Sequence, residues 1–73
     1  MYKTRIQLNT MTDIHKFVSI VSEIKEPITL TDGKGYTVNA KSMLGCVAAL
    51  EWDSLFVTSP VDIYMKISAF AVV

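Results

Sequence analysis

The apolar residues between Ile14 and Ile24 recur at steps of three and four positions, a spacing that leaves this segment few ways to fold. Residues so spaced lie on one side of a helix, and the polar residues between them lie on the other side. The apolar side has to be buried against another element, and a chain of 73 residues can build only one core. The segment therefore predicts a single domain, residues 1–73, whose clearest helix buries a strip formed by Ile14, Phe17, Val18, Val21 and Ile24.

The N-terminal residues follow a different period. Over residues 2–8, apolar and polar side chains alternate, which is typical of a strand with one buried side. Thr12 or Asp13 is expected to cap the following helix, since either side chain offers an oxygen to an unpaired backbone N–H. We expect this helix to run through Lys25 and to stop before Pro27.

A hairpin and a second helix are predicted next along the chain. Residues 28–31 and 36–39 are typical of two strands, and Gly33 and Gly35 between them allow a tight reversal. Ser42 is the best candidate to cap a second helix of about ten residues, because the apolar residues that follow it are in helical order.

Residues 54–59 are rich in β-branched and aromatic side chains and predict a fourth strand. Residues 61–69 are ambiguous: they alternate like a strand, but Ser59 and Pro60 form a typical helix opening. We favour a short terminal helix, because the preceding strand already completes the sheet. The predicted order is strand, helix, strand, strand, helix, strand and helix. It indicates an α+β open-faced β-sandwich, a four-stranded antiparallel sheet with helices on one face.

Charge and composition argue against several classes of protein. Seven basic residues balance seven acidic ones, so no positive field favours nucleic acid. No apolar run approaches the ~20 residues that cross a bilayer, and the N-terminus lacks the pattern of a signal peptide. We therefore expect a cytoplasmic protein that binds no nucleic acid and does not insert into a membrane.

Residues that carry chemistry are few. The single cysteine, Cys46, lies in an apolar stretch and is expected to be a small buried hydrophobic residue. One cysteine, one histidine and scattered carboxylates form no spacing typical of a metal site. Neither paired carboxylates nor a serine–histidine–aspartate set is recognisable. We therefore expect no metal, no cofactor and no enzymatic activity.

The eight residues from Val38 to Gly45 closely resemble the segment around the regulatory serine of HPr, the phosphocarrier of the bacterial sugar phosphotransferase system. The predicted order of elements agrees with that family. The resemblance implies an HPr-like fold, partners among phosphotransferase-system or regulatory proteins, and a regulatory phosphorylation site at Ser42. It also implies a docking patch that includes Met43 and Leu44, although core packing explains one of these two residues equally well.

HPr carries its phosphoryl group on a histidine at the start of the first helix, in a motif like Gly-Ile-His-Ala-Arg-Pro. The corresponding residues here are 13–18, of which Ile14 and His15 match. The resemblance implies that His15 accepts a phosphoryl group, which unpaired N–H groups and the positive end of the helix dipole would hold. Three positions depart from the motif: Asp13 replaces the glycine, Phe17 the arginine and Val18 the proline.

Each candidate residue also has an ordinary structural interpretation. His15 is otherwise a polar residue on the solvent side of a helix, and Ser42 is otherwise only an N-cap. Lys41 either engages phosphate beside Ser42 or is solvated. Trp52 either anchors a partner or covers one end of the core.

Two functions therefore stay open. The first is an HPr-like phosphocarrier or regulatory protein. The alternative is an HPr-fold interaction module without phosphoryl transfer, which binds its partner through Met43, Leu44 and Trp52.

Overall fold

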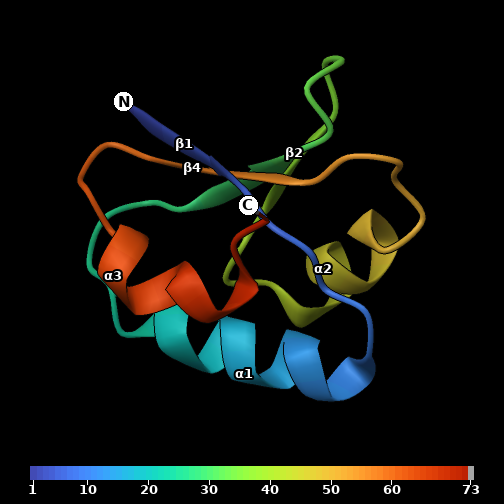
Figure 1. Cartoon of the computed structure of the whole chain (residues 1–73), viewed down its shortest axis with the longest axis horizontal. Coiled ribbons are helices and arrows are strands. Elements are labelled where there is room, and N and C mark those ends of the chain that lie inside the picture. The colour runs from blue at the N-terminus through green and yellow to red at the C-terminus, as the bar shows by residue number, and fades with distance from the viewer. Residues whose placement is uncertain (73) are drawn as a thin grey trace.

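Four short strands form one antiparallel sheet. The computed structural model of the chain describes residues 1–72. In it, β1 (Tyr2–Arg5) pairs with β4 (Phe56–Ser59), β4 pairs with β2 (Thr29–Thr31), and β2 pairs with β3 (Thr37–Asn39). The strand order is β1-β4-β2-β3, so β4, the last strand along the chain, lies between β1 and β2 (Figure 1).

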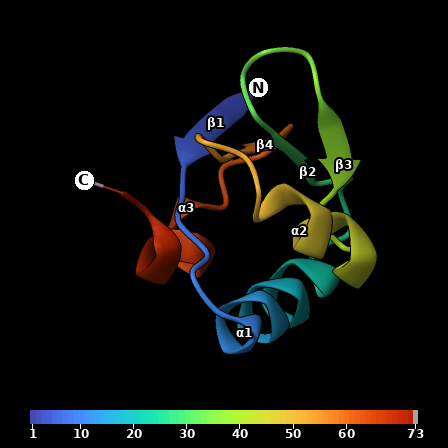
Figure 2. The same ribbon diagram turned by 90° about the vertical axis from the view of Figure 1, so that its right-hand side faces the viewer.

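The register of the sheet separates a buried face from an exposed one. Directly paired residues point to the same face, and Thr4, Val57, Leu30 and Val38 form one such row across the four strands. Leu30 and Val57 in this row are buried. The helices all lie on that side of the sheet (Figure 2). The predicted open-faced sandwich is therefore confirmed.

Three α-helices and a short 3-10 turn complete the fold. They are α1 (Met11–Ser22), α2 (Met43–Ala49), α3 (Tyr64–Ile67) and the 3-10 turn η1 (Ser68–Phe70). The predicted order of elements is confirmed. The predicted strip on the first helix is confirmed too, because the buried residues of α1 are Ile14, Phe17 and Val21.

The predicted start of the first helix is wrong by two to three residues. Thr10, not Thr12 or Asp13, is the N-cap, and its hydroxyl accepts a hydrogen bond from the backbone N–H of Asp13 at 3.1 Å. The carboxylate of Asp13 accepts in turn from the N–H of Asn9 at 3.0 Å. Thr10, Thr12 and Asp13 can each cap a helix in isolation, and these two bonds of Asp13 place the cap at Thr10.

Other boundaries are shorter than predicted. The first strand ends at Arg5 and not at residue 8, although Ile6 still forms an isolated bridge to Ala71. The first helix ends at Ser22 rather than Lys25. The second helix contains 7 residues instead of about ten.

The terminal helix exists, but its predicted opening is wrong. The hydroxyl of Ser59 accepts from the N–H of Val61 at 3.1 Å, and the carboxylate of Asp62 accepts from the N–H of Tyr64 at 3.1 Å. These bonds form a turn after β4, and α3 begins only at Tyr64, without a side-chain cap. Ile63 and Ile67 are buried, and Phe70 packs against the core.

The hairpin between β2 and β3 confirms the predicted reversal. The Asp32 carboxylate accepts hydrogen bonds from the N–H groups of Lys34 at 2.7 Å and Tyr36 at 3.2 Å. Gly33 and Gly35 have φ angles of +80° and +121°, a conformation that costs glycine little and other residues much.

Phe17 lies at the centre of the interface between α1 and the rest of the molecule. Its side chain is fully buried, and its ring meets the edge of the Phe70 ring at a centroid distance of 5.7 Å and an angle of 88°. This edge-to-face contact ties the C-terminal turn to the first helix.

Replacing Phe17 by alanine should lower the free energy of unfolding by about 3–5 kcal/mol, because the change empties the largest buried position in the chain. Chemical denaturation followed by circular dichroism measures this loss. Lys16→Ala, on the neighbouring exposed position, is the control and should change stability by less than about 0.5 kcal/mol. Equal losses for the two variants would contradict the position assigned to Phe17.

Candidate functional site

His15 does not lie at the free end of a helix. Because α1 begins at Met11, His15 is its fifth residue, one turn beyond the cap. Only the N–H groups of the first turn lack an acceptor inside the helix. The side chain of His15 is exposed to solvent. His15 therefore lies one turn beyond the helix start that the resemblance implies for it.

The first turn of α1 already holds an anion of its own. The Asp13 carboxylate bonds to the N–H of Asn9, and the N–H of Asp13 bonds to Thr10. A carboxylate at this end of a helix complements the positive end of the dipole. The Asp13 carboxylate also repels a second anion, so it disfavours a phosphoryl group near His15.

The residues in place of the family's arginine and proline belong to the core. Phe17 is fully buried, and Val18 is half-buried and packs against the buried cluster. Neither side chain points outward beside His15. Lys16 is exposed and supplies one positive charge, but an ammonium group lacks the forked geometry with which a guanidinium binds phosphate.

Ser42 caps α2, as the sequence predicts. Its hydroxyl accepts from the N–H of Gly45 at 3.2 Å.

Gly45 has a further role that its helix propensity does not reveal. A Cβ atom at this position would lie 3.2 Å from the carbonyl oxygen of Asn39 and 3.2 Å from the Cβ atom of Val38. The glycine therefore lets α2 start close against β3.

Lys41 is half-buried, and its side chain bonds to the backbone at the end of α1 rather than to Ser42. Its ammonium group donates a hydrogen bond to the carbonyl of Ile24, just after the C-cap residue Glu23 of α1. A cation is favourable at the negative end of a helix. Lys41 thus ties the start of α2 to the end of α1.

One side of α2 is apolar and exposed. Leu44 is 83% exposed, and Val47 and Ala48, three and four positions later, are exposed too. We call these three residues the α2 face. Met43 is half-buried and packs against the core, so of the two predicted docking residues only Leu44 is free. In Figure 2, α2 lies on the outside of the molecule beside α1.

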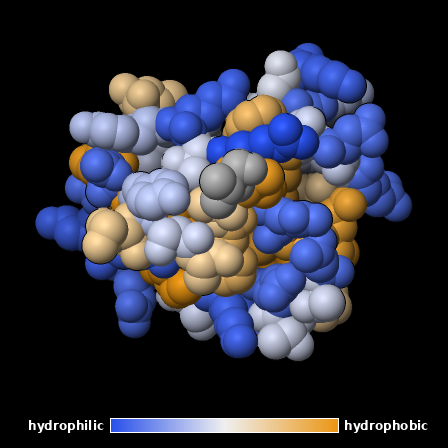
Figure 3. Space-filling view, viewed as in Figure 1, coloured by the Kyte–Doolittle hydropathy of each residue, from blue (hydrophilic) through white to orange (hydrophobic). Residues whose placement is uncertain are grey.

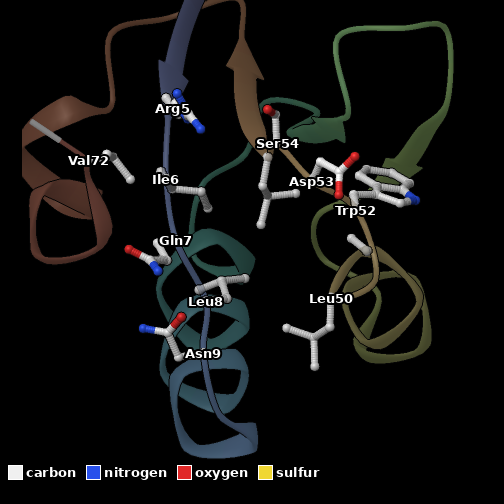
Figure 4. Close-up of a pocket in the computed structure, with 12 residues that line it drawn as sticks. Arg5, Ile6, Gln7, Leu8, Asn9, Leu50, Trp52, Asp53, Ser54 and Val72 are labelled. Atoms are coloured by element: carbon white, nitrogen blue, oxygen red, sulfur yellow. The ribbon is translucent and has the colours of Figure 1, made fainter.

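Trp52 covers one end of the core instead of joining the α2 face. It is half-buried and packs against the buried cluster. It also lines a groove of about 260 Å³ between the β1–α1 connection and the end of α2, where Leu8 and Leu50 project toward each other (Figure 4). The groove is shallow and mixes apolar side chains with polar ones such as Asn9 and Asp53.

Cys46 is a structural residue. Its side chain is fully buried, and its thiol donates to the carbonyl oxygen of Ala40 at 3.3 Å. Burial raises the pKa of the Cys46 thiol to about 11, because the thiolate loses its hydration. The thiol is therefore neutral near pH 7 and a poor nucleophile.

Within residues 1–72, no group of three or more histidine, cysteine, aspartate or glutamate side chains is arranged to hold a metal ion. In the same range, no helix combines the length and the apolar character needed to cross a membrane.

Comparisons with protein-family models, curated proteins and solved structures give no match for this chain. The likeness to HPr therefore rests on the segment from Val38 to Gly45 and on the order of the elements.

The Cys46 thiol should titrate as a buried group. The folded pKa of about 11 lies above the ordinary 9.0, so its contribution to stability is complete below pH 9 and is lost as the pH rises toward 11. The free energy of unfolding should fall by about 2 kcal/mol more for the native chain than for Cys46→Ala over this range. Denaturation curves at several pH values measure the difference, and parallel pH profiles for the two proteins would contradict it.

Proposed function

We propose that the chain is an HPr-like regulatory protein of a bacterial cytoplasm that acts by binding a protein partner through the α2 face, without carrying a phosphoryl group. The observation that carries this proposal is the 83% exposure of Leu44, two residues after the N-cap Ser42. A leucine so exposed, with apolar neighbours three and four positions away, is typical of a helix that packs against a partner.

Burying the α2 face against a partner would contribute substantially to the free energy of binding. Burying one leucine side chain contributes about 1.5–3 kcal/mol, and Val47 and Ala48 extend the same surface. The helix that carries the α2 face is packed against the core, because Cys46 and Ala49 on its opposite side are buried. A partner would therefore meet a preformed helix and would not have to order it.

Ser42 supports a regulatory role for the same surface. A phosphate on this hydroxyl would stay at the N-terminus of α2, where the helix dipole favours negative charge. It would also place about two negative charges beside the apolar Leu44. Phosphorylation of Ser42 would thus leave α2 folded and weaken an apolar partner contact.

The phosphocarrier role is the weaker candidate. His15 is exposed and thus accessible to a donor protein. Asp13, however, occupies the end of α1, and Phe17 points into the core. The side chains near His15 therefore provide little to stabilise a phosphoryl group on its ring.

His15 should not become phosphorylated by a phosphotransferase-system donor protein, because the helix end that would hold the phosphoryl group carries Asp13. The measurement is incubation of the purified chain with the phosphorylated donor, followed by a search for acid-labile phosphate. An HPr protein in the same reaction is the positive control. Acid-labile phosphate that disappears in His15→Ala would show that the chain is a phosphocarrier after all.

Leu44→Asp should weaken partner binding at least tenfold, about 1.4 kcal/mol, because it puts a charge at the centre of the α2 face. Proteins captured from a bacterial lysate identify candidates, and calorimetry with each purified candidate gives the affinity. The matched control is Met65→Asp, because Met65 on α3 is 87% exposed and equally apolar. Figure 3 shows that apolar residues also gather over α3 and η1, so this control tests a real alternative surface. A partner that loses affinity with Met65→Asp but not with Leu44→Asp would refute the α2 face.

A further inference from the structure

The sheet has two edges, and residues 1–72 cover part of one of them. The C-terminal segment pairs with the chain at the end of β1 and just beyond it. There, the N–H of Gln7 donates to the carbonyl of Phe70 and the N–H of Val72 donates to the carbonyl of Arg5, both at 2.9 Å. Within residues 1–72, no strand pairs with the outer edge of β3. An uncovered edge offers a row of backbone hydrogen-bonding groups to another chain.

The register of the hairpin shows which groups of β3 face outward. The N–H of Ala40 donates to the carbonyl of Ile28 across the hairpin at 2.9 Å. In an antiparallel pair, successive residues alternate between facing the partner strand and facing away. Val38 therefore bonds to β2, and the backbone groups of Thr37 and Asn39 point to the free edge.

Most of these outward groups have no acceptor or donor among residues 1–72. The carbonyl of Asn39 is engaged, because it accepts from the N–H of Ser42 at 3.0 Å. The N–H and carbonyl of Thr37 and the N–H of Asn39 remain for an added strand. Both residues are exposed, so a partner backbone can approach them directly.

A groove of about 570 Å³ lies beside β3 and is lined by residues of β3, of β2 and of the segment that leads into β2. Pro27, Ile28 and Val38 give it apolar walls, and Lys25 and Lys41 are its charged residues, with no carboxylate among its lining side chains. The Lys41 ammonium group bonds to the carbonyl of Ile24 but keeps its positive charge. The groove therefore complements a chain that is both acidic and partly apolar.

We propose that β3 is a docking edge for an extended, acidic segment of a protein partner, which adds to the sheet as a fifth strand. The backbone of Thr37 and Asn39 would supply the hydrogen bonds, and carboxylates would meet Lys25 and Lys41. Alternate residues of a strand point to opposite sides, so apolar side chains of the segment on the inner side would lie against the half-buried Val38.

A second copy of this chain fits the edge poorly. The charged residues that flank β3 in the sequence are Lys34 and Lys41, so another β3 would bring lysines to a groove that already holds two. Like charges across paired strands are unfavourable. The proposed edge is also separate from the α2 face, and either surface can be correct without the other.

The probe for this edge is an N-acetylated, C-amidated peptide of sequence Glu-Val-Glu-Val-Glu, and the control peptide replaces each glutamate by lysine. Amide hydrogen exchange measured by NMR is the readout. In the free protein, the amides of Thr37 and Asn39 should exchange at least tenfold faster than that of Val38. The acidic peptide at millimolar concentration should slow them at least tenfold, and the lysine peptide should leave them unchanged.

Two variants separate strand pairing from simple charge attraction. Thr37→Pro removes an N–H that faces solvent, a position where edge strands accept proline, and should abolish the protection of Asn39 by the peptide. Lys25→Glu should weaken peptide binding at least tenfold without altering the backbone. Leu44→Asp should bind the peptide normally, so a failure of this proposal is distinct from a failure of the α2 face.

Several results would overturn the proposal. Peptide binding that protects neither amide would mean surface electrostatics only, and equal binding of the lysine peptide would remove the role of the lysines. Protection that appears without peptide and grows with protein concentration would assign the edge to a second copy of the chain. Absence of binding at millimolar peptide would exclude this chemistry at β3.

Discussion

Burial of the apolar strip of α1 against the inner face of the sheet organises the whole molecule. Ile14, Phe17 and Val21 are each fully buried, and the inner residues Leu30 and Val57 of the sheet belong to the same cluster. A helix presents its sides in a set order, so this burial also decides what the helix shows to solvent. His15 and Lys16 face outward because Phe17 faces inward.

This constraint has a direct chemical consequence. A phosphoryl site on a histidine needs positively charged or N–H groups aimed at the same point in space. Here the position that carries arginine in the HPr motif is occupied by a core residue, and Asp13 bonds to the N–H of Asn9 at the start of the helix. The residues on either side of His15 thus serve the capping and burial of α1.

The segment that most resembles HPr serves the packing between β3 and α2. Lys41 bonds to the end of α1, Ser42 caps α2, and Gly45 allows a close approach to β3. These contacts hold α2 firmly while its outer side, with Leu44, stays uncovered. The turn that contains Lys41 and Ser42 follows β3 directly. The open edge of β3 and the α2 face, the two proposed partner surfaces, therefore adjoin this turn.

The sequence by itself determined the types and order of the elements, the strip on α1, the cap at Ser42 and the glycine reversal of the hairpin. Each of these depends on periodicity, or on hydrogen bonds between residues only a few positions apart, so local sequence contains the necessary information.

Only the tertiary structure decided which of several possible residues begins a helix. Thr10, Thr12 and Asp13 can each cap a helix, and Ser59 can open one, so the sequence offered several starts of similar local energy. The hydrogen bonds of Asp13 with Asn9 and Thr10, and the turn after β4, select among them in the folded chain. The contact of Lys41 with Ile24, the exposure of Leu44 but not Met43, and the open edge at β3 join residues far apart in the chain. Such contacts depend on the strand order and on the helix positions, and no local pattern encodes either.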